Sequence, residues 1–128
     1  MKTGYKIFTL YKENNPYGKH EDAEEGDYLS FNQTSFGGGF IYNKIGRNYR
    51  QYGNGPLAVF DTKGDAKIFL DDFRCGIPEY VLEKVKYKPS KDHVLFYMKD
   101  GIHVEVWCPP HGTRYANWVE IIPDKNEN

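Results

Sequence analysis

The segment at residues 55–73, GPLAVFDTKGDAKIFLDDF, predicts a strand followed directly by a helix and constrains the fold more than any other part of the chain. A Gly-Pro pair precedes a short apolar run at 57–60, which is typical of a strand covered on both faces. Asp61 or Thr62 then suits a helix N-cap, because each side chain can accept a hydrogen bond from a free backbone N–H. The apolar face of the predicted helix consists of Ala66, Phe69, Leu70 and Phe73.

A helix with a single apolar stripe must pack against another element, and the sequence contains no second strong helical pattern. Runs typical of strands occur at 5–11, 28–32, 40–45, 57–60, 80–88, 93–99, 102–107 and 115–122. Asp100 and Gly101 separate two of these runs and predict a tight hairpin. We therefore expect an α+β fold, in which an antiparallel or mixed sheet of about six to seven strands carries one principal helix.

Length and charge narrow the class of protein. A chain of 128 residues fits one domain, 1–128, with a polar tail from about residue 123. The formal net charge of -1 gives no bulk attraction to duplex nucleic acid or to an anionic membrane. We recognise neither a signal peptide nor an apolar membrane span, so we predict a cytoplasmic protein. In that compartment Cys75 and Cys108 are expected to be unpaired thiols.

The sequence predicts no cofactor, no metal site and no catalytic residue. Cys108 and His111 are three positions apart, but zinc needs four converging ligands and no second short Cys/His pair follows. The acidic residues between 20 and 27 lack the spacing of a calcium-binding loop. The glycines at 37–39 match neither the dinucleotide-binding motif nor the P-loop, and they favour a turn.

The polar segment at 46–55, GRNYRQYGNG, is the strongest candidate for a binding site. Its arginines can bind a phosphate through a planar fork of donors, and its tyrosines can stack on a base. The predicted ligand-binding residues are Tyr42, Arg47, Tyr49, Arg50, Tyr52 and Asn54. Strict strand alternation puts the first Arg/Tyr pair on one face and the second on the other, so a single pocket needs a bulge or a second copy of the chain. The alternative is a hairpin or a bulge rich in turn-forming residues.

Five motifs run through the chain: YKIF near the start, FIYNKIGRNYR, GPLAVFDTKGDAKIF, EYVLEKVKYKPS and CPPHGTRYANWVEII. Together they resemble a loose family of small uncharacterised proteins from phages, prophages and microbial genomes. The resemblance covers most of the chain. It implies a phage accessory or counter-defence protein that works in the cytoplasm of the host and sequesters a nucleotide signal.

The strand–turn–helix segment is also similar to one half of the ADP-ribosyltransferase fold. In that fold a strand ending in Ser or Thr precedes a helix, and here Thr62 takes that position. Lys6 stands on the first strand, where the fold would have an Arg or His that binds the dinucleotide. Glu83 and Glu120 are the candidates for its catalytic glutamate. This second resemblance implies an NAD-processing enzyme.

No nucleophile is paired with a base in the sequence, and this favours a non-enzymatic binding protein. We therefore predict a small protein that sequesters a nucleotide-type signal molecule. One alternative is an enzyme like the ADP-ribosyltransferases. The other is a protein that inhibits a host enzyme through an exposed strand edge. A second copy of the chain is a further candidate partner.

Overall fold

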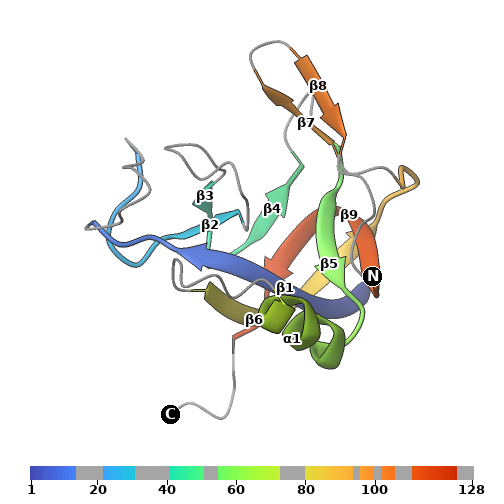
Figure 1. Cartoon of the computed structure of the whole chain (residues 1–128), viewed down its shortest axis with the longest axis horizontal. Helices are drawn as coiled ribbons and strands as arrows, with labels where there is room; N and C mark the ends of the chain where they lie inside the picture. The colour runs from blue at the N-terminus through green and yellow to red at the C-terminus, as the bar shows by residue number, and fades with distance from the viewer. Residues whose placement is uncertain are drawn as a thin grey trace.

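The structure is a computed structural model that describes residues 1–13, 22–30, 41–50, 55–72, 80–93, 96–99, 102–105 and 111–123. Within these residues lie nine strands and one helix (Figure 1). They are β1 (Lys2–Leu10), β2 (Tyr28–Ser30), β3 (Ile41–Tyr42), β4 (Arg47–Tyr49), β5 (Leu57–Phe60), α1 (Lys63–Asp72), β6 (Tyr80–Pro89), β7 (Phe96–Lys99), β8 (Ile102–Glu105) and β9 (Thr113–Ile121).

Four long-range pairings close the sheet into a small barrel. β6 pairs with both β1 and β9, and β5 pairs with β9 on its other side. The ring closes where β5 meets β1 at a single residue pair, Tyr5 opposite Phe60. Strands β2 and β3 extend the sheet from β1, and β4 extends it from β9. Strands β7 and β8 form a separate hairpin that projects from the barrel in Figure 1.

The expected fold class is confirmed in its main features and corrected in one. The large sheet has seven strands, every described pairing is antiparallel, and one helix packs on the sheet. The correction concerns the α+β label. The protein is mostly β-sheet, because the only helix in the described ranges has ten residues and covers one side of the barrel. No helix in those ranges is long and apolar enough to cross a membrane.

The barrel interior follows from strict alternation along β1 and β6. Lys6 and Phe8 of β1 lie opposite Glu83 and Val81 of β6, so these four side chains point to the same, inner face. The buried residues of the inner cluster are Phe8, Tyr42, Val59, Val85, Tyr87, Ala116, Val119 and Ile121. The strands predicted at 5–11 and 80–88 are therefore confirmed, and their side chains alternate between the two faces of the sheet.

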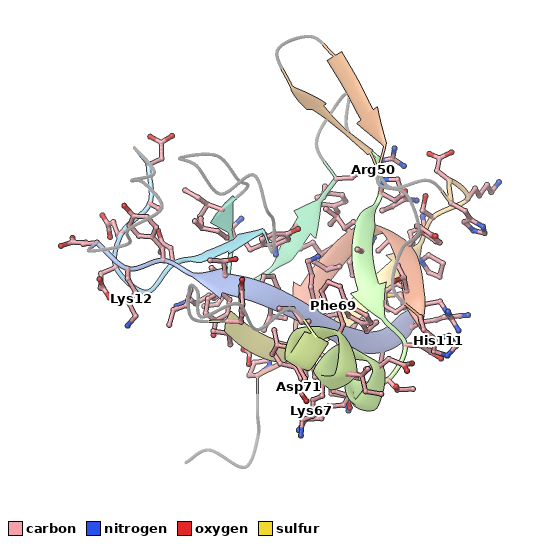
Figure 2. The ribbon with its side chains drawn as sticks, in the orientation of Figure 1. Lys12, Arg50, Lys67, Phe69, Asp71 and His111 are labelled. Atoms are coloured by element: carbon pink, nitrogen blue, oxygen red, sulfur yellow. The ribbon has the colours of Figure 1, made fainter. Side chains whose placement is uncertain are left out.

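Helix α1 covers the outer side of β1 and β5 and buries a second cluster. Thr62 caps the helix, since its Oγ1 accepts a hydrogen bond from the Asp65 backbone N–H at 3.0 Å. Ala66 packs with Ile7 and Phe60 under the helix. Figure 2 shows Phe69 on the side of the helix that faces the sheet, and Lys67 on the opposite side. Phe60 lies under the helix while its neighbour Val59 lies inside the barrel, so β5 is covered on both faces as predicted.

Two other expectations had different outcomes. The hairpin predicted around Asp100 and Gly101 is confirmed by the antiparallel pairing of β7 with β8, in which Lys99 lies opposite Ile102. The alternative hairpin for 46–55 does not describe the start of that segment, since β4 pairs with β9, far away in the sequence. Strand β3 ends at Tyr42, before the expected end at residue 45, whereas residues 31 and 32 of the strand predicted at 28–32 lie outside the described residues.

Asn48 joins the two ends of the seven-stranded sheet, which are β3 and β4. Its buried side chain accepts a hydrogen bond from the Asn43 backbone N–H at 2.7 Å and donates one to the Asn43 carbonyl at 3.0 Å. A longer bond reaches the Val119 carbonyl at 3.4 Å. One amide side chain thus provides the donor and the acceptor that a neighbouring strand would supply.

Replacing Asn48 with alanine is expected to lower the free energy of unfolding by on the order of 1–2 kcal/mol. The loss stays moderate because Asn43 is exposed and its backbone can bond to water instead. Urea unfolding measures the change. Asn43→Ala is the matched control and should be silent, because Asn43 contributes only backbone atoms. Equal stability of the two variants would mean that the Asn48 side chain does not hold the two strands together.

Candidate functional site

The outer side of three adjacent strands carries two rows of polar and aromatic side chains. In one row Glu120 of β9 lies between Arg47 of β4 and Lys86 of β6. In the next row Trp118 of β9 lies between Tyr49 and Lys88. Residues paired across strands point to the same face of a sheet, so all six share one surface. We call it the β4–β9–β6 face, defined by Arg47, Tyr49, Lys86, Lys88, Trp118 and Glu120.

Arg47 is the centre of this face. Its guanidinium carbon lies 4.2 Å from the centroid of the Trp118 ring, within the range of a cation–π contact. Its Nε lies 3.9 Å from Oε1 of Glu120, in a half-exposed ion pair that contributes little to stability. Tyr49 is 57% exposed, so its ring is available for stacking, whereas Trp118 is only 5% exposed. A flat ligand can therefore reach Tyr49 directly.

The charge of the face differs from that of the whole chain. Three basic side chains surround one acidic side chain on it, while the formal net charge of the chain is -1. Neither Lys86 nor Lys88 forms an ion pair with any residue that the structure describes. The face is locally positive and carries the exposed ring of Tyr49, which suits an anion with a flat group attached.

The structure brings together some of the predicted ligand-binding residues and separates others. Arg47 and Tyr49 share the exposed face of β4, as the alternation predicted. Tyr42 lies inside the barrel, because its strand β3 turns this side chain onto Phe8 with ring centroids 4.9 Å apart. Arg50 follows β4 and is held by other groups. Residues 52 and 54, the predicted Tyr52 and Asn54, lie outside the described residues.

Arg50 has a clear structural role. Its Nη1 donates hydrogen bonds to Oδ2 of Asp92 at 2.8 Å and to Oδ1 of Asn117 at 3.4 Å. Its backbone N–H donates to the Asn117 carbonyl at 2.9 Å. These bonds fix the end of β4 to β9 and to the segment after β6. We therefore expect Arg50 to contribute to stability, and Arg47 is the better candidate for ligand binding.

Three residues of the face were missed at the sequence level: Trp118, Lys86 and Lys88. The lysines did carry a signal, because they alternate with buried residues along β6. Nothing local indicated that β9 would bring Trp118 between them and Arg47, because that placement depends on strand register.

Glu83 and Glu120, the two candidate catalytic glutamates, lie on opposite faces of the sheet, since the partner of Glu83 is the inward-pointing Lys6.

Lys6 lies at the end of the barrel that Tyr28, Tyr42 and Glu83 line, and we call this end the barrel mouth. Only 7% of this lysine is exposed. Its Nζ donates a hydrogen bond to the Ala58 carbonyl at 2.7 Å and lies 5.3 Å from the centroid of the Tyr42 ring. Burial lowers the pKa of the Lys6 ammonium from 10.5 to about 8. A charged amine is thus held in a setting that favours its neutral form.

In the described parts of the chain, no three His, Cys, Asp or Glu side chains cluster in a way that could hold a metal ion. Cys75 and Cys108 lie outside those parts, so their prediction as unpaired thiols stays a prediction. His111 lies exposed in the turn before β9 (Figure 2).

Comparisons of the chain with protein-family models, with curated proteins and with solved structures found no match. The phage-family and ADP-ribosyltransferase resemblances therefore stay predictions from sequence.

Proposed function

We propose that the protein binds a nucleotide-type ligand on the β4–β9–β6 face without transforming it. The observation that carries this proposal is the position of Arg47, between Trp118 and Glu120 and beside the exposed ring of Tyr49. A nucleotide combines a charged phosphate with a flat base. Its recognition needs a fixed donor group next to an aromatic ring.

Binding would proceed by exchange of partners on this face. Arg47 would turn from Glu120 to a phosphate oxygen, which costs little because the existing ion pair is long and half-exposed. The base would stack on Tyr49, a contact that contributes on the order of 1–3 kcal/mol. Lys86 and Lys88 would add attraction that weakens with salt. In a phage host, the ligand would be a nucleotide signal, as the family resemblance implies.

Arg47→Ala is expected to weaken nucleotide binding by about tenfold or more, since it removes a charge-assisted bond to phosphate. Thermal stability should change little, because Arg47 is exposed and its ion pair is weak. Native mass spectrometry with a panel of mononucleotides, cyclic oligonucleotides and cyclic ADP-ribose isomers identifies the ligand. Titration with that ligand then gives the affinity of each variant.

Two further variants sharpen this test. Glu120→Gln removes the acidic neighbour of Arg47, so it should strengthen binding, in the opposite direction to Arg47→Ala. Lys67→Ala removes an exposed cation from helix α1 and should leave binding unchanged (Figure 2). If the folded protein retains no nucleotide of the panel, or if Arg47→Ala binds like the parent, the proposal is wrong.

A protein partner is a second candidate, favoured by one observation. Ile45 is 92% exposed in the turn that leads into β4, close in sequence to the exposed Tyr49. Tyr and Arg are enriched at the centre of protein interfaces, and the exposed isoleucine adds apolar area to the same segment of the chain. Ile45→Asp separates the two candidates. It should abolish binding of a protein partner and leave nucleotide binding unchanged.

A further inference from the structure

The barrel mouth holds an amine that the proposed nucleotide face does not use. Lys6 points inward from β1, and its Nζ has a neutral backbone carbonyl, that of Ala58, as hydrogen-bond acceptor. The rings of Phe8 and Tyr42 lie 5.8 and 5.3 Å from this nitrogen. Tyr28 stacks on Phe8 with centroids 5.2 Å apart and forms part of the same lining. The amine is thus enclosed mainly by apolar and aromatic groups.

Such an environment makes a lysine reactive. An ordinary lysine is protonated at neutral pH and has no free electron pair to attack with. Because burial lowers the pKa of Lys6 from 10.5 to about 8, the neutral amine is more abundant near neutral pH by about 300-fold. Lysines activated by desolvation in this way form imines with carbonyl compounds.

The neighbouring groups supply what imine formation needs next, which is a group that can take a proton from the nitrogen and pass it to the departing oxygen. Glu83 lies directly opposite Lys6 across β1 and β6, a position that brings the two Cβ atoms to about 5 Å. Its Oε2 accepts a long hydrogen bond, 3.5 Å, from the Tyr28 hydroxyl. Both Glu83 and Tyr28 are partly exposed, so this end of the barrel is in contact with solvent.

We propose that Lys6 is the nucleophile of a covalent binding site for small aldehydes at the barrel mouth. The neutral Nζ attacks the carbonyl carbon, a C–N bond forms, and the carbonyl π electrons move to oxygen, which takes the proton that the nitrogen gives up. The resulting carbinolamine loses this hydroxyl as water, with Glu83 and Tyr28 positioned to pass the proton. The products are an imine and one water molecule, and no oxidant or reductant takes part. This site is independent of the β4–β9–β6 face.

Reductive trapping of the native protein tests the proposal. The probe is propanal in limiting amount, with cyanoborohydride added to fix any imine, and peptide mass spectrometry then reads each lysine. Lys6 is expected to be labelled at least about tenfold faster than the exposed Lys67. This ratio is smaller than the increase in the neutral fraction of the Lys6 amine, because the buried amine is less accessible to the aldehyde. The rate at Lys6 should level off above about pH 8, where the amine is already neutral.

Two controls decide what a positive result means. Unfolding in urea should remove the preference for Lys6, because the preference depends on the barrel. Glu83→Gln should slow labelling at Lys6 by about 100-fold, the low end of general acid–base catalysis, without changing the rate at Lys67. If the folded protein labels Lys67 and leaves Lys6 unmodified, or labels both at one rate, there is no aldehyde site at the barrel mouth.

Discussion

Gly4→Ala is expected to destabilise the protein by about 3 kcal/mol, the upper part of the range for overpacked cores. A Cβ at this position would lie 2.6 Å from Cγ1 of Val59 and 2.7 Å from the Phe60 carbonyl oxygen. The valine can rotate, but the carbonyl belongs to the backbone of β5 and cannot yield alone. Gly4 is next to Tyr5, whose pairing with Phe60 is the single residue pair that closes the barrel. Urea unfolding should show the loss as a lower midpoint.

Gly64→Ala is the matched control for this prediction. A Cβ at Gly64 would meet nothing closer than Oγ1 of Thr62 at 3.8 Å. Alanine also forms helix better than glycine, so this variant should be as stable as the parent or more stable by up to about 1 kcal/mol. If both alanine variants unfold at the same urea concentration, close contact at Gly4 is not what limits barrel closure.

The sequence predicted the elements of this fold better than their arrangement. Strand β5 and helix α1 were recognisable because an apolar run, a capping residue and helical periodicity are local signals. Closure of the barrel was not predicted, because it depends on which strands pair. A glycine at position 4 also reads as an ordinary strand residue until Val59 and Phe60 are placed against it. The α+β label gave too much weight to one clear helical pattern.

The candidate site was predicted in part for the same physical reason. Alternation within one strand was enough to place Arg47 and Tyr49 on a common face. Trp118 belongs to β9, which is far from β4 in the sequence, and only the pairing register of the two strands brings its ring under Arg47. The burial of the Lys6 amine was not predicted, for a different reason. A lysine that alternates with apolar residues has the same pattern whether its amine points to solvent or into a barrel, and closure of the ring decides between the two.

Lys6→Met is expected to stabilise the protein at neutral pH. The lowered pKa means that holding the charged amine inside the barrel costs about 3 kcal/mol relative to the unfolded chain, from a shift of 10.5 to about 8. Methionine fills a similar volume and carries no charge. The change also removes the hydrogen bond to the Ala58 carbonyl, worth about 1 kcal/mol. The net gain at pH 7 is therefore about 2 kcal/mol.

The pH dependence gives this prediction a distinctive sign. Between about pH 8 and 10.5 the unfolded parent binds more protons at Lys6 than the folded parent does, so the stability of the parent rises with pH. The methionine variant lacks this rise. Its advantage should vanish at about pH 9.8 and reverse above that, where the parent keeps its hydrogen bond and has lost the charge. Urea unfolding of both proteins across this range measures the difference.

Comparing the two proteins at each pH removes the other titrating groups from the result. Burial raises the pKa of Tyr87, which makes the folded state lose stability as the pH rises above 10, but parent and variant share this group. Only Lys6 differs between them. A constant difference in stability from pH 7 to 10.5 would mean that the amine keeps its ordinary pKa. In that case the Lys6 amine is hydrated in the folded protein, so burying its charge would have no cost and the amine would not be an activated nucleophile.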